Sequence, residues 1–183
     1  MSWSIINTDA VIPQAWRNGG GSTRELLAWP HSHDWIVRIS VADIVANGPF
    51  SSFEGIDRWF AVLQGDGVRF FEYELRIDDE LLHFDGALAP DCELLGGPTR
   101  DFNLMHRRGK GRLTVLPAAA PLKLDARCRW LALFTAQGGT LSHGARTTPL
   151  SALSLAWCEN PAPQPATFIG AGAAWWMIWS DEA

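Results

Sequence analysis

The sequence predicts an all-β protein with almost no helix. Its apolar residues recur with a period of two in many short runs, and most of these runs are bounded by Gly, Pro, Asp or Asn. Short, regularly interrupted strands of this kind are typical of sandwich and barrel proteins. No long amphipathic helix appears in the sequence. The stretch 8–15 is expected to contain one short helical turn at most, with Asp9 as its cap.

The clearest predicted strand covers residues 35–42, where alternation separates an apolar face from a face that carries Arg38 and Ser40. The apolar face consists of Trp35, Val37, Ile39 and Val41. The other predicted strands, in chain order, are 58–64, 68–73, 93–95, 101–106, 111–116, 121–124, 130–135, 153–158, 167–169 and 174–179.

Two of these strands resemble each other. Residues 58–65 read RWFAVLQG and residues 129–136 read RWLALFTA, so an Arg-Trp pair opens an apolar strand in both places. Similarity over a single strand suggests two related β-units in one chain. A duplicated barrel would also explain so many strands without helices.

Composition limits the classes of function. The 183 residues suit one large domain or two small ones, and the net charge of −5 argues against a nucleic-acid platform, which needs a concentrated basic face. No apolar run approaches the length of a membrane span, and no signal peptide opens the sequence. Cys92, Cys128 and Cys158 are widely spaced and are expected to be reduced, buried thiols. The expected location is the cytoplasm, with neither nucleic acid nor membrane as a partner.

The stretch 16–25, WRNGGGSTRE, is the most informative in the chain. Three consecutive glycines allow the backbone to approach a ligand or another strand closely. The surrounding guanidinium, amide and hydroxyl groups suit recognition of a small polar anion. A flexible turn between two strands remains an equally simple interpretation. The stretch is not a phosphate loop, because no Gly-Lys-Ser/Thr follows the glycines. It is not a dinucleotide fingerprint either, because no Gly lies three residues after Gly21.

Four motifs, in matching order, resemble the HutD/Ves family. They are residues 16–25, then Trp35 to Ser40, then GPFS and FEGIDR at 48–58, and finally DFNLMHR at 101–107. They cover about residues 14–108, and only the general β-rich pattern fits beyond residue 110. The resemblance implies a double cupin, with an N-terminal barrel over 1–110 and a degenerate C-terminal barrel over 111–183. The resemblance further implies an accessory factor of histidine utilisation or a stress-induced protein, with a proposed role in binding a small pathway metabolite.

The residues fit a metal cupin poorly. Metal cupins carry His-x-His and a later Glu on barrel strands, whereas the one such pair here, His31 and His33, precedes a strand and lacks a following Glu at ligand spacing. We therefore expect no metal and no cofactor. No catalytic residue is expected either, because no nucleophile elbow or placed Cys-His pair exists. A carboxylate pair of Asp57 and Asp101 is one alternative, although pairing of each with a nearby Arg is favoured.

The sequence points instead to a pocket for a small carboxylate in the N-terminal barrel. Arg38 and Ser40 share one strand face, as do Asp101 and Asn103, and polar faces on such apolar strands are expected to point into the barrel. Arg58 is the expected main charge partner, because Asp57 leaves the strand on the opposite face. The complete expected ligand-binding set is Arg17, Asn18, Arg38, Ser40, Arg58, Trp59, Asp101 and Asn103, with Trp59 or Trp16 packing on a planar ligand. Mutual neutralisation of these Arg and Asp residues within the barrel wall is the simpler rival.

Three functions stay open at this point. The first is a non-catalytic regulator that binds a carboxylate such as urocanate or formylglutamate. The second is a cofactor-free cupin enzyme, an isomerase or hydrolase acting on a carboxylated or sugar substrate. The third is a protein-interaction module, in which the ten tryptophans would form an exposed patch. A homodimer is left open in each case.

Overall fold

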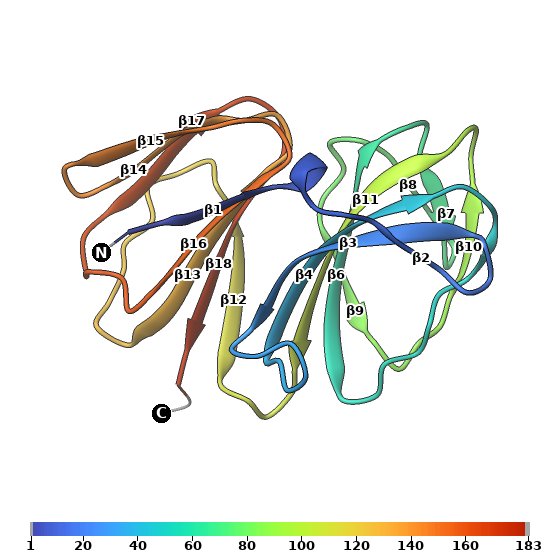
Figure 1. Cartoon of the computed structure of the whole chain (residues 1–183), viewed down its shortest axis with the longest axis horizontal. Coiled ribbons are helices and arrows are strands. Elements are labelled where there is room, and N and C mark those ends of the chain that lie inside the picture. The colour runs from blue at the N-terminus through green and yellow to red at the C-terminus, as the bar shows by residue number, and fades with distance from the viewer. Residues whose placement is uncertain (1, 182–183) are drawn as a thin grey trace. The chain divides into compact units, whose positions relative to one another are not determined.

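The computed structural model describes residues 2–181, and these residues form an all-β structure (Figure 1). Eighteen strands and one short 3-10 helix, η1 (Thr8–Ala10), account for their regular structure. Contacts divide the chain into two compact units. The N-terminal unit spans Val11–Arg108, and the C-terminal unit combines the chain from Gly109 onward with the segment that ends at Ala10.

The N-terminal unit consists of a six-stranded and a four-stranded antiparallel sheet. The larger sheet has the order β2 (Gln14–Ala15), β3 (Gly21–Trp29), β4 (Val37–Ile44), β11 (Thr99–Arg107), β6 (Ile56–Gln64) and β9 (Leu82–Asp85). The smaller sheet has the order β5 (Gly48–Pro49), β10 (Asp91–Leu94), β7 (Val68–Phe70) and β8 (Tyr73–Leu75).

Three central strands, β4, β11 and β6, carry the predicted alternation. Val37, Ile39 and Val41 are fully buried on one face of β4, whereas Arg38 and Ser40 point to the other. That second face packs part of its length against the smaller sheet, where Phe60 of β6 stacks on Phe70 of β7 with ring centroids 5.0 Å apart. One apolar core of this unit therefore lies between its two sheets.

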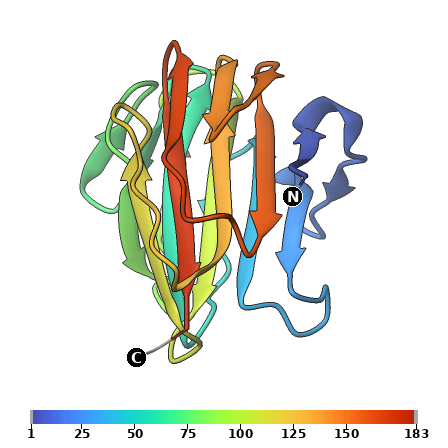
Figure 2. The same cartoon turned by 90° about the vertical axis from the view of Figure 1, so that its left-hand side faces the viewer.

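The C-terminal unit has the same two-sheet composition. Its five-stranded sheet has the order β1 (Ser4–Asn7), β16 (Ser154–Glu159), β13 (Cys128–Thr135), β18 (Ala174–Ser180) and β12 (Arg112–Pro117). Its three-stranded sheet has the order β15 (Arg146–Leu150), β14 (Gly139–His143) and β17 (Ala166–Gly170). Figure 2 shows β18, in red, between β12 and β13. The core between these sheets is apolar and includes Leu131, Leu133, Leu141, Cys158 and Trp176.

The first strand belongs to the C-terminal unit. β1 pairs with β16 over four residues, and Figure 1 shows the blue β1 beside the orange β16. Asn7 fixes the turn that follows, because its side-chain oxygen accepts a hydrogen bond from the Asp9 N–H at 3.0 Å. The expected helical turn is thus present as η1, but the cap is Asn7 rather than Asp9.

The structure differs from the predicted strands at several points. Residues 68–73 form two strands, because Phe71 adopts a φ of 57° and reverses the chain between β7 and β8. Residues 121–124 contribute only one isolated bridge, from Leu122 to Ala166. Strands without a clear alternating pattern were not predicted; these are β1, β2, β3, β5, β9, β14 and β15.

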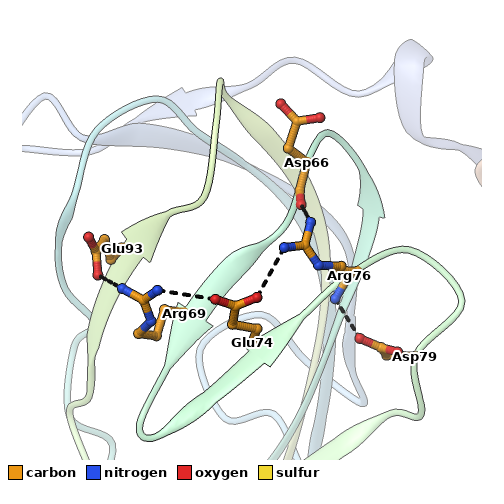
Figure 3. A network of polar contacts seen from close by, with 6 residues as sticks. All are labelled: Asp66, Arg69, Glu74, Arg76, Asp79 and Glu93. Atoms are coloured by element: carbon orange, nitrogen blue, oxygen red, sulfur yellow. Dashed lines mark hydrogen bonds and ion pairs between the residues drawn. The ribbon is translucent and has the colours of Figure 1, made fainter.

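The outer face of the small sheet in the N-terminal unit carries charge. Arg69 of β7 lies between Glu74 of β8 and Glu93 of β10, and Arg76 joins the same network through Glu74 (Figure 3). All these side chains are about half exposed. Exposed pairs of this kind contribute little to stability.

None of the ten tryptophans, all of which lie within residues 2–181, is an exposed side chain. Trp130, Trp175, Trp176 and Trp179 are buried, and the other six are half-buried. The interaction module that required an exposed tryptophan patch therefore lacks its surface. In the part of the chain that the structure describes, no helix has the length and apolar character needed to cross a membrane.

Candidate functional site

A cavity of about 540 Å³ opens in the N-terminal unit. Its volume lies within the range of small-molecule sites. The walls come from the β2–β3 hairpin, from β4, β6 and β11, and from the segment that leads from β5 to β6. The lining residues are Ala15, Trp16, Arg17, Asn18, Thr23, Arg38, Ser40, Ala42, Pro49, Phe50, Ser51, Phe53, Arg58, Phe60, Asn103 and Met105.

Strand register brings the polar residues together in two rows. Arg38, Met105 and Arg58 lie opposite one another across β4, β11 and β6. The next row inward consists of Ser40, Asn103 and Phe60. Because side chains alternate along a strand, both rows point to the same face of the sheet. The cavity is therefore built on paired strands, which hold its polar groups more rigidly than loops would.

Arg58 is the most unusual residue of the cavity, since its residue surface is only 5% exposed. Its guanidinium carbon lies 5.2 Å from the ring centre of Phe50, 5.4 Å from that of Phe53 and 5.2 Å from that of Phe84. Burial, followed by the nearby charge of Arg38, lowers the pKa of Arg58 to about 10. Arg58 consequently remains charged at neutral pH.

The hydrogen bonds of Arg58 involve neutral groups. Nε and Nη2 both donate to Oδ1 of Asn103, at 3.3 and 2.9 Å, and Nη1 donates to the carbonyl oxygen of Ser51 at 3.2 Å. Within residues 2–181, no carboxylate forms a salt bridge with Arg58. A guanidinium has five N–H donors. These contacts use three, so one donor remains on each of Nη1 and Nη2.

Asn103 is itself held in place. Its Nδ2 donates to Oγ of Ser40 at 3.3 Å, which directs its Oδ1 toward Arg58. Ser40 is buried, and Asn103 is almost completely so. A buried amide with both ends paired has one preferred orientation. Ser40 and Asn103 therefore position the guanidinium without neutralising it.

Arg38 differs from Arg58 because it already has an anionic partner. Its Nε lies 2.6 Å from Oε2 of Glu25 on the neighbouring strand β3. Nη1 also reaches the sulfur of Met105 at 4.0 Å. Arg17 and Asn18, in contrast, are exposed at the rim, on the turn of the β2–β3 hairpin. The uncompensated charge inside the cavity is that of Arg58.

The glycine run forms the turn of this hairpin. The N–H of Trp16 donates to the carbonyl oxygen of Gly21 at 2.9 Å, and Gly19 adopts a φ of 71°. A Cβ on Gly21 would lie 2.3 Å from the carbonyl oxygen of Asp43 and about 3.0 Å from the Trp16 ring. Only glycine fits at position 21, where the two backbones approach each other this closely. The run thus forms a turn between two strands, and its neighbours Trp16, Arg17 and Asn18 line the cavity.

Six of the eight expected ligand-binding residues line this cavity, and two lie elsewhere. Trp59 follows Arg58 on the same strand and therefore points to the opposite face, where it stacks on His83 with ring centroids 4.4 Å apart. Trp16, the other tryptophan considered for a planar ligand, does line the cavity. Its Nε1 donates to Oγ1 of Thr23 at 2.8 Å, which fixes the indole at the wall.

Asp101 lies one row deeper than Asn103, between Ala42 and Val62, and is completely buried. Oγ1 of Thr99 donates to its Oδ2 at 2.7 Å, and Oδ1 has no hydrogen-bond partner among residues 2–181. Burial is the main cause that raises the pKa of Asp101 to about 8. Asp57 lies on the other face of β6, with His83 3.8 Å away, so the two carboxylates do not form a pair.

The aromatic lining was not part of the expected site. Phe50, Phe53 and Phe60 and the thioether of Met105 supply most of the apolar wall. A signal for two of them was present, because Phe60 is two residues from Arg58 and Met105 is two residues from Asn103. Residues at this spacing share a strand face.

No candidate metal centre appears in the described part of the chain, which contains no group of three or more His, Cys, Asp or Glu side chains placed to hold an ion. His31 and His33 stack on each other with ring centroids 5.9 Å apart, and both are exposed. Cys92, Cys128 and Cys158 are free and buried. Burial raises the pKa of Cys92 to about 12, of Cys128 to about 11 and of Cys158 to about 12, so none is a reactive thiolate.

The strand that resembles β6 carries no comparable site. In β13, Leu131 takes the position of Phe60 and faces the apolar core of the C-terminal unit. Arg129, at the position of Arg58, is half exposed, and its Nε lies 2.8 Å from Oδ2 of Asp181. The repeat thus preserves the strand but pairs its arginine with a carboxylate at the surface.

Comparison with known proteins covers most of the chain. A family model described as HutD matches residues 9–176. A 21.2 kDa protein encoded in the hutC 3′ region of Pseudomonas putida is 38% identical over 128 residues, which are 63% of this chain and 57% of that protein. Protein Ves of Cronobacter sakazakii is 36% identical over 106 residues, or 55% of this chain and 58% of that protein. The matched stretches cover little more than half of each relative.

Solved structures match over the full length. A conserved protein of unknown function from Pseudomonas aeruginosa PAO1 superposes with a TM-score of 0.80 at 26% identity, covering 100% of both chains. HutD from Pseudomonas fluorescens SBW25 (formate condition) gives a TM-score of 0.81 at 22% identity, again over 100% of both chains. A cupin 2 conserved barrel domain protein from Leptotrichia buccalis gives 0.56 at 10% identity over 97% of this chain and 96% of that one, which shows a cupin-like fold.

Proposed function

The chain belongs to the HutD family, and on that premise we propose that it binds a small carboxylate in the N-terminal cavity and regulates or assists histidine utilisation without catalysing a reaction. The observation that carries this proposal is Arg58. Its guanidinium is buried, charged and hydrogen-bonded to neutral groups, and two of its donors remain open.

A buried charge without a counter-ion is costly, because its lost hydration is only partly replaced. Three phenyl rings and two hydrogen-bonding oxygens offset part of that cost around Arg58. A carboxylate would supply the missing charge and accept from Nη1 and Nη2 together, which is the bidentate geometry that Arg favours. Arg17, Asn18, Arg38, Ser40 and Asn103 are the further ligand-binding residues that we propose at the same cavity.

Binding is favoured over catalysis by the chemistry of the wall. Among the lining residues, all of which are described by the structure, there is no Asp, Glu, His, Cys, Lys or Tyr. General acid–base catalysis relies on such side chains, and the hydroxyls of Thr23, Ser40 and Ser51 in the wall would need one of them as a base to act as nucleophiles. The second candidate, a cofactor-free isomerase or hydrolase, would have to recruit Glu25, which Arg38 already pairs.

The family and the apolar wall support the proposed metabolite class. Relatives are described as HutD or by a location beside hutC, which connects them with histidine utilisation by name. Urocanate is a planar imidazole acrylate that Trp16 and Phe50 could cover, and formylglutamate carries a second carboxylate that Arg17 could reach at the rim. We propose these two carboxylates as ligands, in a cytoplasmic protein with three reduced thiols.

We also propose that each unit is a cupin-type barrel and that the C-terminal one is degenerate. Each unit pairs a large sheet with a small one. The N-terminal unit has a cavity lined in part by polar side chains, whereas the described core cluster of the C-terminal unit is apolar. The apolar interior of the C-terminal unit supports a structural role for it. A homodimer remains a prediction for sedimentation or light scattering.

Titration calorimetry with urocanate, formylglutamate, glutamate and formate tests the proposed function. We expect one site per chain for urocanate or formylglutamate and an affinity that falls with added salt, because the main contact is ionic. Spectra of each compound recorded after long incubation would reveal turnover, which would favour the enzyme instead. Absence of binding by all four carboxylates would refute the proposal.

A further inference from the structure

A short segment covers Arg58 on the side away from the large sheet. This segment, residues 49–53, is called the strap below; it connects β5 to the turn before β6. Pro49, Phe50, Ser51 and Phe53 all line the cavity. Three of these residues also touch the guanidinium, through the ring of Phe50, the ring of Phe53 and the carbonyl oxygen of Ser51. The strap therefore lines the cavity and contacts the charge inside it.

The outer side of the strap is attached to one surface loop, Gly86–Pro90, between β9 and β10. The N–H of Phe50 donates to the carbonyl oxygen of Pro90 at 3.0 Å, and the N–H of Phe53 donates to that of Gly86 at 2.6 Å. Oγ of Ser52 donates to the carbonyl oxygen of Ala87 at 2.9 Å. The strap thus lies between Arg58 and this loop, with hydrogen bonds on both sides.

Close packing makes the contact between strap and loop sensitive to movement. A Cβ on Gly86 would lie 2.8 Å from the carbonyl oxygens of both Phe53 and Ile56. The two backbones therefore approach each other as closely as glycine permits, so that a side chain at residue 86 would displace the strap. Leu88, in the same loop, has 49% of its surface exposed.

We propose that the strap is a ligand-responsive cover, which a bound carboxylate holds closed and which passes this change to the surface loop 86–90. The proposal rests on the proposed function of the cavity. A ligand bound to Arg58 would contact the strap on one side and the large sheet on the other. It would do so only while the strap is closed, and binding would therefore shift the population toward the closed state. Ligand occupancy would then be visible at the surface, as a regulator requires.

Amide hydrogen exchange on the full chain tests the proposal. With saturating urocanate we expect the Phe50 and Phe53 amides to exchange at least about five-fold more slowly, because both donate to the loop only when the strap is closed. Amides of β13 and β18, in the C-terminal unit, should keep their rates. Calorimetry under the same conditions would report whether urocanate is bound; if it does not bind, formylglutamate is used in its place.

Two variants separate the strap from the binding residues. Gly86→Ala should push Phe53 away, speed exchange at its amide and weaken urocanate binding several-fold, although residue 86 is outside the cavity lining. Ser52→Ala removes one strap–loop hydrogen bond at an exposed position and should act in the same direction with a smaller effect. Ser142→Ala, which removes the hydroxyl that contacts Thr147 in the C-terminal unit, is the matched control and should change neither quantity.

The outcomes distinguish this inference from the proposed function. Bound ligand with unchanged exchange at Phe50 and Phe53 would overturn the cover and leave carboxylate binding intact. Unchanged affinity in both Gly86→Ala and Ser52→Ala would also overturn it. If none of the tested carboxylates binds, the proposed function fails, and the cover fails with it.

Discussion

Asn103 presents one oxygen to Arg58, and this oxygen accepts hydrogen bonds from both Nε and Nη2 of the guanidinium, at 3.3 and 2.9 Å. A carboxylate in the same place would neutralise Arg58. The amide instead fixes the orientation of the guanidinium and leaves its charge uncompensated. The charge of Arg58 consequently remains available to an anion that enters the cavity.

Arg58→Ala should weaken carboxylate binding by about 1.5–3 kcal/mol, the range for a hydrogen bond to a charged group. Arg58→Lys should recover only part of this loss, because an ammonium keeps the charge but lacks the planar pair of donors. Titration calorimetry with urocanate or formylglutamate gives both numbers, and thermal unfolding should show that both variants remain folded.

Arg129→Ala is the matched control for Arg58. Arg129 occupies the corresponding position in β13, where it is half exposed and paired with Asp181. Its removal should leave the affinity unchanged. Equal binding by wild type and Arg58→Ala, or a ligand located beside β13, would contradict the assignment of the site.

The sequence predicts which side chains share a face of the central strands, because apolar and polar residues alternate along them. In β4, three completely buried aliphatic residues alternate with Arg38 and Ser40, so the pattern specifies strand and orientation together. β3 has no such pattern, since its residues 21–29 are mostly half-buried and begin within the glycine run. Its strand conformation comes from pairing with β4, a long-range contact that local sequence does not encode.

The site could be predicted as a set of residue types but not as a lining. Register decides which residues meet, and register depends on how the strands pair. Arg38 and Arg58 face the same cavity because each lies opposite Met105 of the central strand β11. The same alternation that places Arg58 inside the cavity excludes Trp59 from it. Asp101 is on the cavity side of β11 but lies one row deeper than Asn103, so it does not reach the lining. Its spacing in the sequence does not reveal this depth.

The protein should hold no tightly bound transition metal after purification without a tag. No lining side chain of the cavity is a His, Cys, Asp or Glu, the residues that hold such ions. Dialysis against a chelator should leave the affinity for urocanate or formylglutamate unchanged. Near-stoichiometric Zn, Fe or Mn that survives the chelator, measured by elemental analysis, would contradict this expectation.

Asp101 should make stability decline as pH rises. The carboxyl has an ordinary pKa of 3.8, and burial raises it to about 8 in the folded chain. Between these values the unfolded chain is ionised and the folded chain keeps its proton. The stability contributed by this group is therefore full below pH 3.8 and falls by up to about 1.4 kcal/mol per pH unit until pH 8. Urea unfolding should show that the free energy of unfolding of Asp101→Asn rises relative to that of wild type from pH 5 to pH 8.

Asp43→Asn is the control with the opposite sign. Burial alone would raise the pKa of Asp43, but hydrogen bonds from Arg100 and Arg24 outweigh it and lower the pKa. The stability contributed by Asp43 is thus present above pH 3.8 and lost as pH falls. Asp43→Asn should lose stability at neutral pH relative to wild type, and the difference should narrow in acid.

Parallel pH profiles for wild type and Asp101→Asn would show that Asp101 is ionised when buried.

Asn103→Asp gives the sharpest test of the charge at Arg58, because it changes the charge beside the guanidinium and hardly changes the shape. The new carboxylate would take the place of an oxygen that already lies 2.9 Å from Nη2, and Oγ of Ser40 could turn to donate to it. The resulting internal ion pair should lower the affinity for urocanate or formylglutamate at least about tenfold, or 1.4 kcal/mol, without lowering the urea midpoint. Asn18→Asp adds the same charge at the exposed rim, where solvent screens it, and should have a much smaller effect. Wild-type affinity in Asn103→Asp would mean that the ligand does not use the charge of Arg58.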